Sequence, residues 1–225
     1  MRIIPSVFVI GDSHTNIFQN SPLFQVFHIG PVTAYNLIKE GSSTKSSEKI
    51  NEILNIVKKG DIVILVFGEI DCRIHIFYQY KKNHETQTIS ELIKKTIHNY
   101  CTFVRKIKKQ EIEVCIYGIT PPGEEGNIYN YPYYADRKLQ QKIYHEFNSE
   151  LKSYCNDFRI NFLDIFPLVS DKSGFLLKEY SDDGLHLNNK ILPSIEKMLQ
   201  KKYGLRLVLR YKINQLKERF KTRKR

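Results

Sequence analysis

Short apolar runs alternate with amphipathic stretches along most of the 225-residue chain. The runs resemble strands, and the stretches between them repeat apolar residues at the spacing of a helix. Strands that alternate with helices form a parallel sheet joined by right-handed crossovers and covered by helices on both faces. The pattern therefore predicts a three-layer α/β/α sandwich with a five-stranded parallel sheet. The expected strands cover residues 6–10, 24–29, 61–67, 113–119 and 158–165, and the expected helices cover 33–40, 48–59, 89–109 and 135–155.

Glycine-containing turns follow the first three expected strands. They read "GDSH" from Gly11, "HIGP" around Gly30 and "FGEID" around Gly68. In a parallel sheet, binding sites gather beyond the carboxyl ends of the strands. Ser13 therefore has two explanations, a simple polar turn or an activated nucleophile. A nucleophilic serine needs a base, and the base needs an orienting group.

His186 is the candidate base among the seven histidines. It lies in "YSDDGLHLNN", after the last expected strand, with Asp183 three residues earlier. That spacing lets a carboxylate bind one imidazole nitrogen while the other faces outward. The spacing is common by itself and gains meaning only beside Ser13. Four other histidines lie in polar or amphipathic stretches and are expected to be solvated: His75, His84, His98 and His145.

Together, the blocks "GDSH", "HIGP", "FGEID" and "DGLH" resemble the SGNH, or GDSL-type, hydrolases over residues 6 to about 200. The resemblance implies a flavodoxin-like sheet and a triad of Ser13, His186 and Asp183. It also implies a backbone N–H from Gly30 at the oxyanion, with Gly68 in the place of the family's glycine. No cofactor and no metal are implied.

The reaction implied by the resemblance is a double displacement through an acyl-serine. Release of the acyl group to water makes an esterase, and release to a sugar hydroxyl makes an O-acyltransferase. The expected substrate is an acyl ester of a carbohydrate, above all an acetyl ester. Tyrosines in residues 128–134 either stack on sugar rings or pack the loop that carries them. His14 either lines the acyl pocket or caps the turn.

The third block departs from the family pattern, which reads glycine, any residue, asparagine, aspartate. Ile70 stands where the asparagine donates an N–H to the oxyanion. Loss of one such donor typically costs about 10²–10³ in rate. Arg73 and the backbone amides of Ser13 and Gly30 are the remaining candidate donors, although "EIDCR" could also form a salt-bridged loop. A degenerate domain that binds a glycan or a partner without turnover therefore stays open as the alternative function.

The net charge of +11 is concentrated at the carboxyl end of the chain. Residues 201–225 contain eleven Lys or Arg and one acidic residue, Glu218, so the remaining chain is nearly neutral. That distribution argues against nucleic-acid binding by the body. The expected division is a hydrolase-like domain over 1–202 and a basic amphipathic tail over 203–225. Such helices bind anionic membranes, although a solvated terminus or an RNA-binding arm has the same composition.

The compartment follows from what the sequence lacks. No apolar run approaches the roughly 18 residues of a membrane-spanning helix, and residues 1–10 have the character of a core strand and not of a signal peptide. The four cysteines are widely spaced and predict neither a zinc site nor disulfides. Cys115, in a strand-like run, is expected to be a small buried hydrophobe. We expect a cytoplasmic protein that associates with a membrane surface through its tail.

Overall fold

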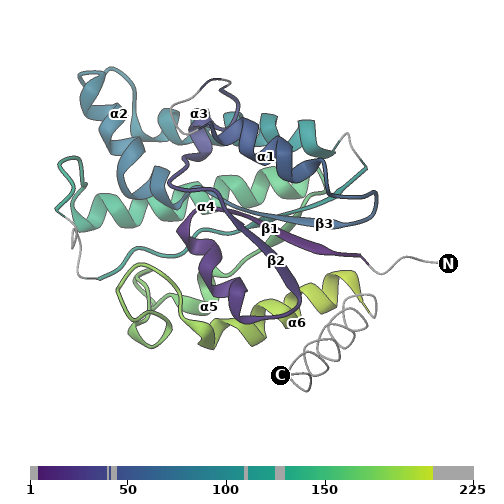
Figure 1. Ribbon diagram of the computed structural model, residues 1–225. Coiled ribbons are helices and arrows are strands. Elements are labelled where there is room, and N and C mark those ends of the chain that lie inside the picture. Colours follow the sequence, from purple (N-terminus) through teal and green to yellow (C-terminus); the bar gives the residue numbers. More distant parts are fainter. Residues whose placement is uncertain (1–4, 40, 42–44, 109–110, 125–129, 205–225) are drawn as a thin grey trace.

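A computed structural model describes residues 5–39, 41, 45–108, 111–124 and 130–204. Within these ranges, five strands form one parallel sheet in the order β2-β1-β3-β4-β5 (Figure 1). The strands are β1 (Val7–Gly11), β2 (Phe24–His28), β3 (Ile62–Val66), β4 (Glu113–Tyr117) and β5 (Asn161–Leu163). The predicted five-stranded parallel sheet is confirmed.

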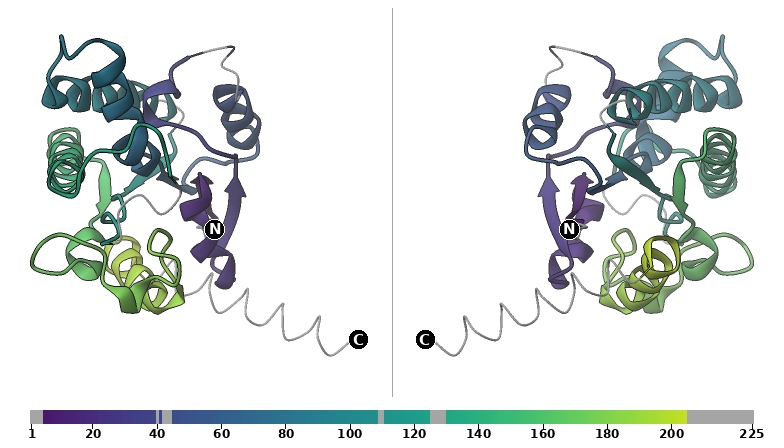
Figure 2. Two further views of the ribbon diagram at one scale, coloured as in Figure 1. Left: turned by 90° about the vertical axis from the view of Figure 1, so that its left-hand side faces the viewer. Right: turned by 90° about the vertical axis from the view of Figure 1, so that its right-hand side faces the viewer.

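Helices cover both faces of the sheet. Figures 1 and 2 show α1, α3 and α4 on one side and α6 on the other. The helices are α1 (Ser46–Leu54), α2 (Ile76–Lys82), α3 (Ile89–Lys108), α4 (Arg137–Asp157), α5 (Phe166–Val169) and α6 (Leu192–Tyr203). Short 3₁₀ segments form η1 (Ser13–Asn20), η2 (Ala34–Asn36), η4 (Lys178–Tyr180) and η5 (Asn189–Ile191), and a π-helical segment forms η3 (Asp71–His75).

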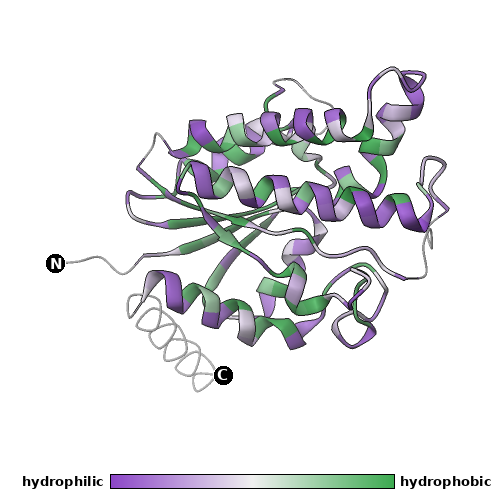
Figure 3. Cartoon of the chain, turned by 180° about the vertical axis from the view of Figure 1, so that it is seen from behind, coloured by the Kyte–Doolittle hydropathy of each residue, from purple (hydrophilic) through white to green (hydrophobic). Residues whose placement is uncertain are grey.

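The core has two halves because successive side chains of a strand point to opposite faces of the sheet. In β1, Phe8 and Ile10 pack with the layer that contains α1, α3 and α4, whereas Val7 and Val9 pack with η1 and α6. The strands β1 and β3 are buried throughout, as nearly continuous apolar runs predict. Figure 3 shows the hydrophobic residues concentrated along the strands. Cys115 is fully buried in β4, as expected.

Several expected elements are shorter in the structure. The expected helix 48–59 ends at Leu54, and the carboxylate of Asp61 accepts the N–H of Lys58 in the turn that leads to β3. Among residues 33–39, helical backbone is confined to the turn η2, because tertiary hydrogen bonds fix this segment: Asp71 accepts from the N–H of Ala34, and Asn99 donates to the carbonyl of Tyr35. The last strand covers Asn161–Leu163 and not 158–165, because Arg159 adopts φ +51° where the chain leaves α4.

The carboxyl end of the described chain is α6, which continues to Tyr203 and ends at Gly204. The predicted basic tail lies almost entirely in residues 205–225, outside the described ranges. None of the helices within those ranges is long and apolar enough to cross a membrane.

Candidate active site

Ser13 stands at the first residue of η1, directly beyond the carboxyl end of β1. The strand ends there because Asp12 caps η1: its Oδ1 accepts the N–H of His14 at 2.9 Å, and its carbonyl accepts the N–H of Thr15 at 3.1 Å. Asp12 itself is 1% exposed, and burial raises its pKa to about 6. Ser13 remains partly exposed. The turn is therefore a helix cap that holds a serine at the edge of the sheet.

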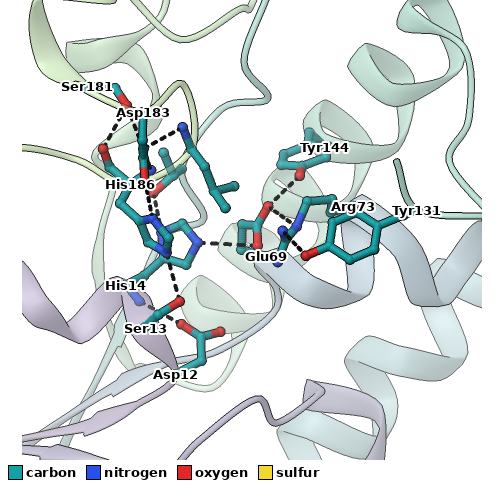
Figure 4. Close-up of polar contacts among 12 residues, drawn as sticks. Asp12, Ser13, His14, Glu69, Arg73, Tyr131, Tyr144, Ser181, Asp183 and His186 are labelled. Carbon is teal, nitrogen blue, oxygen red and sulfur yellow. Dashed lines mark hydrogen bonds and ion pairs between the residues drawn. The ribbon is translucent and has the colours of Figure 1, made fainter. Parts of the chain in front are cut away.

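The structure brings Ser13 together with His186 and Asp183 (Figure 4). Ser13 Oγ lies 2.8 Å from His186 Nε2, and His186 Nδ1 lies 2.6 Å from Asp183 Oδ2. The neighbouring carboxylate, Asp182, instead accepts a hydrogen bond from Asn188 Nδ2 at 3.1 Å. The three residues thus have the geometry of a nucleophile, a base and an orienting group.

Asp183 is held as an anion by the loop that carries His186. Its Oδ1 accepts the backbone N–H groups of Leu185 at 2.9 Å and His186 at 2.7 Å. Partial burial acts in the opposite direction, but these bonds and the bond from the His186 ring lower the pKa of Asp183 to about 2. An ionised Asp183 accepts a hydrogen bond from the N–H at Nδ1 of His186. The proton therefore stays on Nδ1, and Nε2 is free to accept the hydroxyl proton of Ser13.

Gly30 lies just beyond the end of β2, beside the turn that carries Ser13, since Ile29 donates its N–H to the carbonyl of Gly11 at 3.0 Å. Its φ of +99° favours glycine, and a Cβ at this position would meet no atom within 4 Å. Asp71 fixes the segment that follows, because its carboxylate accepts the N–H groups of Ala34 at 2.6 Å and Tyr35 at 3.2 Å. The aspartate of the third block therefore braces the loop of the second.

A family of known proteins matches most of the chain. The family model for GDSL-like lipase/acylhydrolase proteins matches residues 7–192, which include the sheet and all three residues of the predicted triad. The chain belongs to the GDSL-like lipase/acylhydrolase family. No match was found among curated proteins.

Solved structures of GDSL-like acylhydrolases share the fold. A GDSL-like lipase from Bacteroides thetaiotaomicron superposes with a TM-score of 0.60 at 18% identity, over 88% of this chain and 88% of that one. An acetyl xylan esterase superposes with a TM-score of 0.52 at 15% identity, over 87% of this chain and 98% of that one. At these identities, the similarity concerns the fold.

The third block of this GDSL-like acylhydrolase contains an ion pair, as one interpretation of "EIDCR" expected, because Arg73 lies 3.1 Å from Glu69, but the block begins a helical segment and not a loop. Helical backbone starts at Glu69 and continues through η3 into α2. The turn before it requires a glycine, because Gly68 has φ +115° and a Cβ there would lie 2.8 Å from Phe147 Cε1. Ile70, in the asparagine position, is partly exposed and has no side-chain donor.

Arg73 is engaged away from Ser13. Its Nε lies 3.1 Å from Glu69 Oε1, and its Nη1 donates to the hydroxyl of Tyr131 at 3.2 Å. Glu69 also accepts the hydroxyl proton of Tyr144 at 2.7 Å. The candidate role of Arg73 as an oxyanion donor stays a prediction, and these contacts favour a structural role for its guanidinium.

His14 lies behind the triad. Its side chain is 4% exposed, and its Nε2 lies 3.2 Å from Glu69 Oε2. The two atoms are close enough for an ion pair, but they are not aligned for a hydrogen bond. Nδ1 lies 3.3 Å from Thr120 Oγ1. The buried contacts place the imidazole in the interior of the domain, where an acyl chain would have to displace it.

Sequence reasoning placed Glu69 at this edge of the sheet but missed its contact with His14, and it missed Thr120 and Tyr144 as neighbours of the site. The available signal was position alone, because Ser13-His14 and Gly68-Glu69 follow two adjacent parallel strands. His75 was also misjudged as solvated: its side chain is 15% exposed and its Nδ1 lies 3.5 Å from Asp71 Oδ1. The other three histidines predicted to be solvated are exposed: His84, His98 and His145.

A groove of about 980 Å³ lies elsewhere, between α4 and the segment 166–174. Leu139, His145 and Phe166 are among its lining residues, which do not include Ser13, Asp183 or His186. This groove is therefore separate from the site of the predicted chemistry.

Proposed function

We propose that the protein is a serine esterase that cleaves acyl esters of a carbohydrate, above all acetyl esters, through an acyl-Ser13 intermediate. The observation that carries this proposal is the unbroken chain of contacts from Ser13 Oγ to His186 at 2.8 Å and from His186 to Asp183 at 2.6 Å. Membership of the GDSL-like acylhydrolase family supports ester cleavage as the reaction.

The proposed reaction has two displacements. Ser13 Oγ attacks the ester carbonyl carbon as its proton passes to His186 Nε2, and Asp183 holds the resulting imidazolium. Collapse of the tetrahedral intermediate breaks the ester C–O bond, and the proton on Nε2 leaves with the alcohol. A water molecule then gives a proton to His186 Nε2 as its oxygen attacks the acyl-serine carbonyl carbon. Collapse of this second tetrahedral intermediate breaks the bond between the acyl carbon and Ser13 Oγ, and the proton on Nε2 returns to Oγ.

The oxyanion in this proposal is bound by backbone N–H groups of Ser13 and Gly30. Support comes from the position of both residues at the carboxyl ends of adjacent strands and from the bracing of the Gly30 loop by Asp71. Ile70 supplies no third donor, so we expect a slower enzyme than one with asparagine there. Gly68 acts by shaping the turn before Ile70.

The carbohydrate substrate is supported by aromatic residues near the third block. Tyr131 contacts Arg73, and Tyr133, which is 41% exposed, packs edge-on against Tyr78 with ring centroids 4.9 Å apart. Exposed aromatic rings of this kind are able to stack on sugars. An acetyl xylan esterase among the solved structures with this fold acts on a polysaccharide ester by its name.

Labelling and activity measurements test the proposal. A fluorophosphonate probe should label the wild-type protein at Ser13, located by peptide mass spectrometry, and should not label Ser13→Ala. p-Nitrophenyl acetate and an acetylated oligosaccharide should be hydrolysed by the wild type alone. Transfer to a sugar hydroxyl in place of water would make the enzyme an O-acyltransferase with the same intermediate. A folded wild-type protein without labelling would contradict the proposal.

Ile70 favours one other candidate function, a domain that binds a glycan or partner without turnover. In that case the wild-type protein would bind acetylated oligosaccharides in a calorimetric titration but would neither react with the probe nor release acetate. The intact contacts among Ser13, His186 and Asp183 support the enzyme over the binding domain.

A further inference from the structure

A cluster of buried titratable side chains lies directly behind the predicted triad (Figure 4). Glu69 lies at its centre. Its carboxylate accepts a hydrogen bond from Tyr144 Oη at 2.7 Å and lies 3.1 Å from Arg73 Nε and 3.2 Å from His14 Nε2. Glu69 and His14 are each 4% exposed at the side chain. The reaction proposed above uses none of these side chains. Burying several charges in a protein interior is unfavourable unless they are paired, so the cluster needs another explanation.

The imidazole of His14 covers one face of His186. The ring centroids lie 4.8 Å apart, and the planes are tilted by 40°. His186 comes from a surface loop and its side chain is 30% exposed, so the buried ring of His14 supports it from the inside. The bond to Asp183 fixes one atom of the His186 ring, whereas the contact with His14 restrains its plane.

His14 is itself fixed through three atoms. Its backbone N–H is bound by Asp12, its Nδ1 faces Thr120 Oγ1 at 3.3 Å, and its Nε2 faces Glu69 at 3.2 Å. A neutral imidazole donates a proton at one nitrogen only, whereas an imidazolium donates at both. The Thr120 hydroxyl is a donor as well as an acceptor, so its contact is compatible with either form of the ring, and it is the carboxylate of Glu69 at 3.2 Å that favours the imidazolium.

The charges around His14 favour that protonated form. Burial alone would lower the pKa of His14, but contact with Glu69, aided by the nearby carboxyl of Asp12, raises it. Arg73 acts in the opposite direction from beyond Glu69, and His186 faces the ring from the other side. Burial opposes ionisation of Glu69 as well, yet its contacts with His14, Arg73 and Tyr144 lower its pKa to about 2.

We propose that the buried His14–Glu69 ion pair positions the imidazole of His186 for proton exchange with Ser13. His14 and Glu69 are positioning residues, because they act through His186 and touch neither substrate nor a reacting atom. The inference rests on the proposed function, since it assigns a support to the same triad. It also explains why two charged residues lie in the interior beside the triad, although the proposed reaction transfers no proton to or from either of them.

Three variants separate positioning from folding. His14→Leu leaves Glu69 in contact with Arg73 and Tyr144, so it should lower the labelling of Ser13 more than the melting temperature. Glu69→Gln leaves both His14 and Arg73 without their carboxylate, so it should lower the labelling and the melting temperature together. The double variant removes one of these two unpaired cations, and we expect it to regain part of the melting temperature lost in Glu69→Gln but not the labelling rate.

The expected kinetic signature is a fall in the maximal rate of fluorophosphonate labelling with an unchanged half-saturating concentration. A misplacement of about 1 Å at a reacting group can cost about 10²-fold, and we expect a loss of at least about tenfold. Ser21→Ala is the matched control: Ser21 is 5% exposed and donates to the carboxylate of Glu196 at 2.6 Å, before the start of β2 and so at the opposite end of that strand from Gly30. It should leave the maximal labelling rate unchanged.

Two outcomes would overturn the inference. One is a folded double variant that is labelled at the wild-type maximal rate, because the pair would then serve the fold alone. The other outcome is a neutral His14 in the wild-type protein, which would contradict the proposed ion pair. Nitrogen-15 NMR of the histidines measures this, and we expect both ring nitrogens of His14 to be protonated at neutral pH. This measurement does not depend on whether the double variant folds. Absence of labelling in the wild type would overturn the proposed function and this inference with it.

Discussion

Asp183 binds the ring and the backbone of the same histidine: its Oδ2 lies 2.6 Å from Nδ1 of His186, and its Oδ1 accepts the His186 backbone N–H at 2.7 Å. One carboxylate therefore fixes both the tautomer of the ring and the turn that presents it. Oδ2 orients the ring and Oδ1 holds the backbone of the turn. Replacing one of these oxygens by an NH₂ group, as in asparagine, should therefore disturb one of the two roles more than the other.

Asp183→Asn is expected to preserve the turn and damage the chemistry. The amide oxygen can still accept the backbone N–H groups, but an NH₂ group facing Nδ1 favours the wrong tautomer of His186. Ester hydrolysis should fall by about 10⁴, the loss typical of such a change in a triad. Asp182→Asn is the control, because Asp182 binds Asn188 and not the ring. Steady-state hydrolysis of p-nitrophenyl acetate measures both, and equal losses in the two variants would contradict the assignment.

Ile70→Asn should restore a side-chain donor in the third block. If the helical segment at Glu69 holds the new amide towards the oxyanion, hydrolysis of simple esters should rise by up to about 10²–10³. Ile74→Asn, one turn further along the same helical segment, should produce no gain. An unchanged or lower rate in Ile70→Asn would mean that the block has been rebuilt for another purpose.

Asp12 should make the stability of the protein depend on pH in the mildly acidic range. Burial raises its pKa from 3.8 to about 6, so the folded state binds this proton more tightly than the unfolded state does. The stabilisation is complete below about pH 4 and is lost as the pH rises through about 6, by about 3 kcal/mol. Asp12→Asn keeps an acceptor for the N–H of His14 and should lack this contribution. Urea unfolding between these pH values tests it, and parallel curves for both proteins would contradict it.

Gly68→Ala should destabilise the fold through a steric clash. The new methyl group would lie 2.8 Å from Phe147 Cε1, in a backbone conformation with φ +115°. Gly60→Ala is the control, since Gly60 also has a positive φ, +83°, but open space around it. The free energy of unfolding should fall by about 1–3 kcal/mol more in Gly68→Ala than in Gly60→Ala. Adding Phe147→Leu to Gly68→Ala should recover part of the difference, and equal losses in the two alanine variants would exclude the clash.

Deletion of residues 205–225 should separate membrane binding from ester cleavage. The deletion keeps Gly204, which ends α6, and removes nine Lys or Arg residues. Binding to vesicles with anionic lipids should fall sharply, because each basic residue near the surface contributes about 1 kcal/mol. Binding of the full chain should also weaken with added salt. Cosedimentation measures both, and equal binding of the two proteins would contradict a role for the tail.

The parts of the site that the sequence predicts well are those that depend on neighbours along the chain. The turn at Gly30 and the pairing of Asp183 with His186 are local, and their residue types and spacing reveal them. The contact between His14 and Glu69 depends on the pairing of β1 with β3, and Tyr144 reaches Glu69 from α4. Contacts of this kind depend on the three-dimensional packing of distant segments, so spacing along the chain does not indicate them.

The fold follows the same division. Buried strands such as β3 are apolar throughout and are read directly from the sequence. Residues 33–40 have a helical pattern in the sequence, but Asp71 and Asn99 bind the backbone of Ala34 and Tyr35 and limit the helix to a single turn within residues 33–39. Hydrogen bonds from distant residues outweigh the helical propensity of this segment, and the sequence of the segment alone does not indicate them.

Ser13 and His186 are 173 positions apart in the chain. In the proposed mechanism, the serine leaves the ribosome long before its base, so the growing polypeptide carries an unactivated hydroxyl until almost the whole domain has been made. Cleavage of esters by a half-finished chain is thereby avoided without an inhibitor. A serine-directed probe added to a translation reaction would accordingly report completed molecules and ignore nascent ones.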